Sequence, residues 1–301
     1  MQQPVHFYSF LTLLVLFLSL PKSEIAINDE DTQIEIKTIH SEEGLLEGYQ
    51  AYIKTPVCET ETCYIVQINF TWDIIGRYQK FDTIRGEGLT KLDHIPFTET
   101  DYQKLDQLLK DAKSPLANYK KEDLVRDTRS SAIDGFTGAT VLEIKERVIE
   151  GGVYSCFTLW HLAHGSLVDS LQNRTANLLD SALVAHMVTK EDQDMSYFLL
   201  QQFSEQDYLQ YLPQFLKTFE YGSGYYAKNA LEKMPPKVFA LPITQDFFAT
   251  QFERLNYFAQ VALLKKLQGN TISPSLKNIL EAALDKRNSV KNTLIQKLLE
   301  T

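Results

Sequence analysis

The segment Tyr64-Ile-Val-Gln-Ile-Asn-Phe-Thr-Trp72 alternates apolar and polar side chains and runs into Asp73-Ile-Ile-Gly76. Apolar residues at every second position are typical of a strand that buries one face, and the Asp and Gly that follow favour a turn. Arg77 to Thr83 has the composition of a returning strand, and Gln33 to Ile39 shows the same alternation earlier in the chain. We therefore expect an antiparallel hairpin or meander in the first half of the protein.

Helical signals follow these strands. Phe97-Thr-Glu-Thr-Asp-Tyr102 predicts a helix that is capped by Thr98 or Thr100 and ends before Ser114-Pro115. Its apolar stripe is formed by Tyr102, Leu105, Leu108 and Leu109. Another helix is expected to begin at Thr140.

After Gly165 the apolar residues recur at intervals of three and four, which is typical of amphipathic helices. The connections between them are short and contain Gly or Pro, as at Gly222-Ser-Gly224 and Pro235-Pro236. Paired helices of this size suggest an array of the HEAT or armadillo kind. No clean repeat is visible by eye, so an irregular helical domain is the alternative. The expected fold class is α+β, with a small antiparallel-sheet domain over 27–164 and an all-α domain over 165–301.

The first residues resemble a secretory signal. Phe7 to Leu20 contains no charged residue and is shorter than the ~20 residues that a membrane-spanning helix needs. We expect residues 1–26 to be a signal peptide and the protein to be exported, periplasmic or extracellular. The alternative is an uncleaved N-terminal anchor, so any association with a membrane is expected through the N-terminus alone.

The net charge excludes one class of partner. The 301 residues carry a formal charge of -9 and no basic cluster, whereas nucleic-acid binding needs concentrated Lys and Arg. We expect no nucleic-acid partner.

Three cysteines are present. In an exported protein, Cys58 and Cys63 are close enough in sequence to form a local disulfide, which is the expectation here. A redox-active dithiol is the alternative, although the spacing differs from the two-residue motif of such sites. Cys156, between Tyr154 and Phe157, is expected to be a buried apolar residue.

One motif points to a cofactor. Asp134-Gly135-Phe136-Thr137-Gly138-Ala139-Thr140 resembles the flavinylation motif of FMN-binding domains, such as the peripheral subunits of sodium-pumping quinone reductases and Rnf-type complexes. Every specified position of that motif is met. The resemblance implies that Thr140 carries FMN through a phosphoester and that a separate flavin transferase installs it from FAD outside the cytoplasm.

The same resemblance assigns roles to the other motif residues. Gly138 and Ala139 would let the backbone and the transferase approach closely, and Asp134 would orient the turn or the acceptor hydroxyl. Thr137 occupies the Ser/Thr position of the motif. The structural alternative is a capping box, in which Thr140 caps a helix and Glu143 reaches back three residues later.

Two functions therefore remain open. The first is an exported electron carrier that holds FMN on Thr140 and docks a redox partner with its helical half. The second is an exported, non-catalytic binding or scaffold protein that keeps only the fold of an FMN-binding domain. No residue is assigned a catalytic role in either. His161 and His164 share a helix face, where packing at the rim of the helix competes with metal binding.

Overall fold

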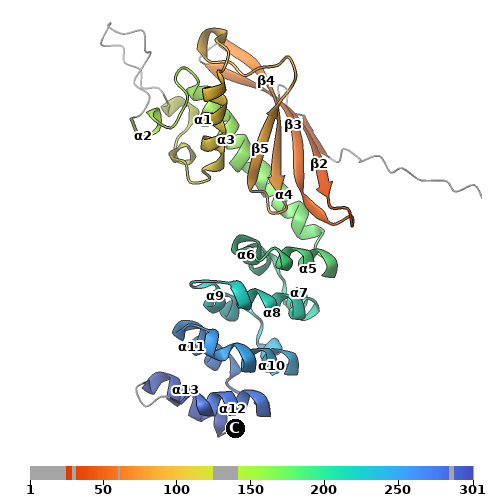
Figure 1. Cartoon of the computed structure of the whole chain (residues 1–301), viewed down its shortest axis with the longest axis vertical. Coiled ribbons are helices and arrows are strands. Elements are labelled where there is room, and N and C mark those ends of the chain that lie inside the picture. The colour runs from red at the N-terminus through yellow and green to blue at the C-terminus, as the bar shows by residue number, and fades with distance from the viewer. Residues whose placement is uncertain (1–24, 29–31, 60–61, 125–141, 285–287, 301) are drawn as a thin grey trace, which may run out of the picture.

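A five-stranded antiparallel sheet with its covering helices is followed by an elongated stack of helices in the computed structural model of this protein (Figure 1). The structure describes residues 25–28, 32–59, 62–124, 142–284 and 288–300. The expected α+β layout, with a sheet first and helices after it, is confirmed.

The strands form a simple meander in which each pairs with its neighbour in sequence, in the order β1-β2-β3-β4-β5. Their bounds are β1 Ile25–Asn28, β2 Gln33–His40, β3 Leu46–Glu59, β4 Thr62–Asp73 and β5 Tyr78–Thr83. The three strands expected from the sequence correspond to β2, β4 and β5. Strand β1 begins at Ile25, which pairs with Ile36, so it starts inside the segment 1–26 that was expected to be a signal peptide.

Strand β3 is the central strand that the sequence pattern did not reveal. It contains Gly48 and Pro56, two residues that argue against a strand interior. The pairing explains how Pro56 is accommodated: β2 pairs with β3 only as far as Lys54, so at Pro56 the side of β3 that lacks an N–H faces no strand partner. Gly48 lies where a Cβ atom would come within 2.3 Å of the Trp72 carbonyl oxygen.

One face of the sheet makes the core of the N-terminal part. Ile53, Ile68 and Phe70 are fully buried on this face, and Trp72 is 1% exposed beside them. Gly76, at φ +80°, closes the turn between β4 and β5 in a conformation that favours glycine, as the sequence predicted for this turn.

Short helices and one long helix flank the sheet. Helix α1 spans Glu99–Lys110, and its N-cap is Thr98, whose side chain forms a capping box with Asp101. The 3-10 turns η1 Leu92–His94, η2 Pro115–Asn118 and η3 Lys121–Asp123 and the single-turn helix α2 Leu142–Lys145 complete this region. The helix expected from Thr140 is therefore α2, which begins at Leu142.

Helices α3 Val153–His164 and α4 Ser166–Asn177 cover the buried face of the sheet. The Trp72 indole donates a hydrogen bond to the carbonyl oxygen of Ala163 over 2.9 Å, and the buried Thr175 hydroxyl donates to that of Ile74 over 2.6 Å. The break between α3 and α4 coincides with Gly165, the expected start of the helical domain. Because α4 is tied to the sheet, the independent stack of helices begins only after Asn177.

The remaining helices alternate between two layers (Figure 1). One layer contains α5 Ser181–Thr189, α8 Leu212–Tyr221, α10 Pro242–Gln251 and α12 Pro274–Ala282. The other contains α6 Gln193–Gln202, α9 Tyr226–Lys233, α11 Tyr257–Leu267 and α13 Ser289–Leu299. The short helix α7 Glu205–Gln210 and the turns η4 Pro236–Ala240 and η5 Phe252–Arg254 lie at the connections. Each helix contacts the preceding and following members of its own layer, which is the arrangement of a helical-repeat array.

This array has a strict period of 32 residues in its core. Equivalent positions of the first layer are Val184, Leu216, Phe248 and Leu280, and those of the second layer are Leu199, Leu231, Leu263 and Ile295. All eight side chains are at most 2% exposed. Hydrogen bonds also join residues one period apart, as from the Asn256 side chain to the Gly224 carbonyl oxygen over 2.8 Å. The interpretation as an irregular helical domain is therefore replaced by a repeat whose register is exact.

Charged groups join the sheet to the first repeat. The Arg77 guanidinium, beyond the β4–β5 turn, contacts Asp73 at 2.6 Å and Asp192 at the start of α6 at 2.9 Å. Lys190, at the end of α5, lies 3.1 Å from the carboxylate of Glu47 on β3. The two parts are thus linked at two separate points.

Candidate functional site

The five residues to which the resemblance to a flavinylation motif assigned roles, Asp134, Thr137, Gly138, Ala139 and Thr140, lie outside the described residues. What the structure does describe is how the chain enters and leaves this segment. Leu124 precedes it and Ile144 follows it on α2, and both side chains are fully buried. The described chain on both sides of 125–141 is therefore anchored in the hydrophobic core by a buried side chain.

The expected disulfide is confirmed. Cys58 and Cys63 are bonded to each other, and they occupy directly paired positions of β3 and β4 close to the tip of the hairpin. The bond closes the end of the longest strand pair. Cys156 is fully buried on α3, as expected, and burial raises the pKa of its thiol to about 12.

The two histidines on α3 are packed among aromatic rings. The ring of His161 lies 4.2 Å from that of Phe157, and the ring of His164 lies 4.8 Å from that of Trp160. Nε2 of His164 donates a hydrogen bond to the carbonyl oxygen of Leu109 over 2.7 Å. Burial lowers the pKa of both imidazoles. Within the described ranges, no three His, Cys, Asp or Glu side chains gather as a metal-binding group.

One edge of the helical array presents exposed aromatic rings. Tyr225, Tyr257 and Phe258 are 62%, 42% and 52% exposed at the N-terminal ends of α9 and α11, and Val290 continues the row on α13. Tyr225 and Tyr257 are one repeat period apart, as are Phe258 and Val290. We call these four residues the aromatic rim. Aromatic side chains are enriched in protein interfaces, and here the repeat sets them in a line.

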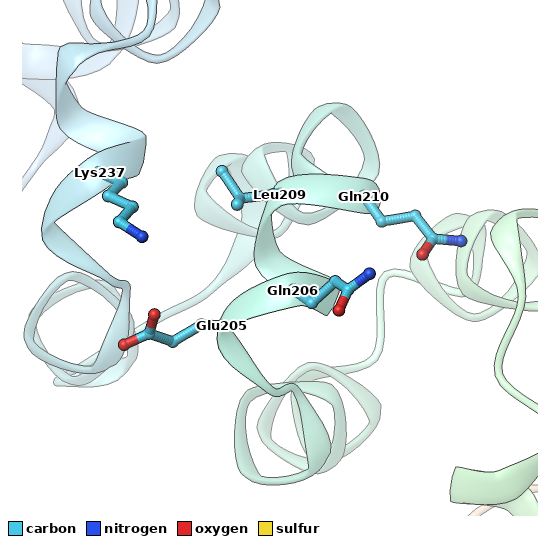
Figure 2. A pocket seen from close by; sticks show the side chains of 5 residues that line it. All are labelled: Glu205, Gln206, Leu209, Gln210 and Lys237. Carbon is cyan, nitrogen blue, oxygen red and sulfur yellow. The ribbon is translucent and has the colours of Figure 1, made fainter.

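Another edge of the array is hollowed. An outer hollow of about 660 Å³ lies between α7 and η4 and is lined by Glu205, Gln206, Leu209, Gln210 and Lys237. Figure 2 shows Lys237 and Glu205 extending into the gap from opposite walls, with Leu209 on the same wall as Glu205, whereas Gln206 and Gln210 point to the other side of α7. Leu209 is 45% exposed, so the outer hollow offers an apolar contact in addition to two charged groups.

A second, inner hollow of about 260 Å³ lies on the other side of Glu205, which lines both hollows. Its apolar lining includes Phe203, Tyr208 and Met234, and its rim carries Lys233 and Lys266. Both hollows form where α7 and η4 interrupt the regular alternation of layers. The sequence carried a signal for one of these interruptions, because Pro235-Pro236 precedes Lys237 directly.

None of the residues at the two hollows or on the aromatic rim was predicted as a site from the sequence. The 32-residue period would have revealed the aromatic rim, whereas the two hollows lie where α7 and η4 interrupt the regular alternation of helices. Among the described residues, no helix is long and apolar enough to cross a membrane. No protein-family model, curated protein or solved structure matches this chain.

Proposed function

We propose that this chain is an extracytoplasmic electron-transfer protein that carries FMN on Thr140 and binds a partner protein with its helical array. The observation that carries the proposal is the motif Asp134-Gly-Phe-Thr-Gly-Ala-Thr140, which meets every specified position of a flavinylation sequence. It stands two residues before the start of α2, in the part of the chain attached to the sheet domain.

Two further observations support it. The ends of the segment are anchored by Leu124 and Ile144, so a group attached near Thr140 would stay close to the sheet domain. The disulfide between Cys58 and Cys63 suits the oxidising compartment in which flavinylation of this kind takes place.

The chemistry assigned to the threonine is a phosphoryl transfer. The Thr140 hydroxyl oxygen forms a bond to the flavin-proximal phosphorus of FAD as the pyrophosphate bond breaks and AMP leaves. The hydroxyl proton passes to the transferase or solvent. The bound flavin would supply electron transfer, and the protein would supply attachment and partner recognition.

A second candidate function is partner binding without a flavin. The aromatic rim favours it, because four apolar side chains, in two pairs that are each one repeat period apart, are exposed on the array. In this case the sheet domain would act as a rigid cap on the array.

One experiment separates the two. The full chain is co-expressed with a flavin transferase of the FMN-binding family, and the purified protein is analysed by in-gel flavin fluorescence and intact mass. We expect one FMN phosphoester on the wild type, none on Thr140→Val, and one on the control Thr128→Val, which removes a hydroxyl outside the motif. Absence of the adduct from the wild type would eliminate the flavin and leave partner binding as the function.

A further inference from the structure

We propose that the two neighbouring hollows between α7, the end of α9 and η4 bind an acidic segment of a partner polypeptide, with an apolar side chain of that segment seated on Leu209. This inference rests on the partner-binding part of the proposed function and is independent of the flavin.

The charge around the hollows selects an acidic occupant. Lys233, Lys237 and Lys266 line them, against the carboxylates of Glu205 and Glu232. The Glu232 carboxylate is already 2.7 Å from the ammonium group of Lys228, outside the lining. In a chain with a formal charge of -9, this leaves a local excess of positive charge on the array.

The lysines are held in place without carboxylate partners. Lys233 donates to the carbonyl oxygen of Gln201 over 3.3 Å, and Lys266 donates to those of Glu232 and Met234 over 2.8 and 3.2 Å. Lys237 makes no polar contact with any residue that the structure describes. Carbonyl groups orient an ammonium group but leave its charge uncompensated, so a carboxylate arriving from a partner gains favourable Coulomb energy.

The apolar element of the site is Leu209. Its exposed side chain projects between the walls formed by α7 and η4 (Figure 2). Glu205, on the wall opposite Lys237, also has no charged partner in the described part of the chain and would repel a carboxylate beside it. The favoured segment therefore places an apolar residue over Leu209 and its acidic residues on the lysine side.

The test uses the full chain and two fluorescein-labelled peptides of equal length. One alternates Asp or Glu with Leu, and the other replaces each acid with Lys. Fluorescence anisotropy titrations are performed at low and at moderate salt. We expect the acidic peptide to bind more tightly than the basic one and its affinity to fall as salt is raised.

Two variants locate the binding site. Lys237→Glu and Leu209→Ser are each expected to weaken binding of the acidic peptide about fivefold, the size of one exposed charge pair or one half-buried apolar contact. The matched controls are Lys277→Glu and Leu284→Ser, at exposed positions outside the lining of the hollows and outside the aromatic rim. Circular dichroism spectra verify that all four variants are folded.

The inference is overturned if the two peptides bind equally, if neither binds, or if Lys237→Glu and Leu209→Ser bind the acidic peptide as the wild type does. None of these outcomes bears on the flavin, which the gel experiment decides separately. Loss of affinity in both site variants, with unchanged affinity in both controls, supports the inference.

Discussion

Substitution of Leu231 by alanine tests whether the 32-residue period is the framework of the array. Leu231 lies on α9, is fully buried, and occupies the same repeat position as Leu199 and Leu263. Helix α9 contacts α6 on one side and α11 on the other, so the leucine is internal to the second layer. The matched control is Leu209→Ala on α7, which removes the same atoms from a side chain that is 45% exposed.

The expected magnitude follows from burial. A Leu→Ala change in a closely packed core costs about 2–5 kcal/mol, because transfer energy is lost and a cavity remains. The complete burial of Leu231 and its position between two neighbouring helices place it in the middle of that range, at about 3 kcal/mol. The control should cost no more than about 0.5 kcal/mol, as is usual for surface positions.

Equilibrium unfolding in urea, followed by far-ultraviolet circular dichroism, measures both values. Because repeat arrays do not always unfold in a single step, hydrogen exchange of α9 and α11 amides gives a second readout. Leu231→Ala should accelerate exchange in both helices. If it destabilises the protein no more than Leu209→Ala, or leaves exchange in α11 unchanged, the proposed repeat core is wrong.

Further predictions concern titration and thiol chemistry. Burial lowers the pKa of His164 in the folded protein. As the pH falls below about 6.5, the ordinary pKa of histidine, the unfolded chain therefore takes up a proton before the folded chain does. Stability should therefore fall between pH 7 and pH 5, and less steeply in His164→Gln; equal slopes in urea titrations would contradict this. Burial also raises the pKa of the Cys156 thiol to about 12, so iodoacetamide should leave the native protein unlabelled at pH 8. Mass spectrometry should find one label after unfolding and three after unfolding with reductant, which also opens the Cys58–Cys63 bond; rapid labelling of the native protein would exclude burial of Cys156.

The sequence predicted most of the sheet because local patterns decide it. Strands β2 and β4 alternate apolar and polar residues, and the Asp73–Gly76 turn, with the composition that such turns require, predicts β5 as the returning strand. Strand β3 was not predicted because Ala51 and Thr55 occupy two of its buried positions and Pro56 interrupts its alternation of apolar and polar residues. Only the strand pairing shows that β2 has no residue opposite Pro56, because its pairing with β3 stops at Lys54. That is a non-local fact, which no local pattern contains.

The helical half was predicted as a class, but its period was missed for a physical reason. Equivalent core positions hold different apolar residues, such as Val184, Leu216, Phe248 and Leu280, since each repeat needs burial and volume and does not need a given residue type. The spacing of these core positions is 32 residues throughout, whereas the residue type changes from repeat to repeat. The two hollows could be predicted neither from the spacing of the core residues nor from their identity, because the hollows form where α7 and η4 bring distant lysines together. The motif that ends at Thr140 is the opposite case, because the sequence alone indicates it and it lies outside the described residues.

The two charged links between the sheet and the array bear on how both proposals fit together. Arg77 ties the β4–β5 turn to α6, and Lys190 ties α5 to Glu47 on β3. Exposed ion pairs of this kind each contribute about 1 kcal/mol or less to stability, so their main effect is geometric. Two separated links restrict rotation of the first repeat about the end of α4. Because the later repeats stack on the first, the restriction extends along the array. A partner segment held at the hollows would therefore keep a fixed direction relative to the sheet domain, to which the proposed flavin would be attached.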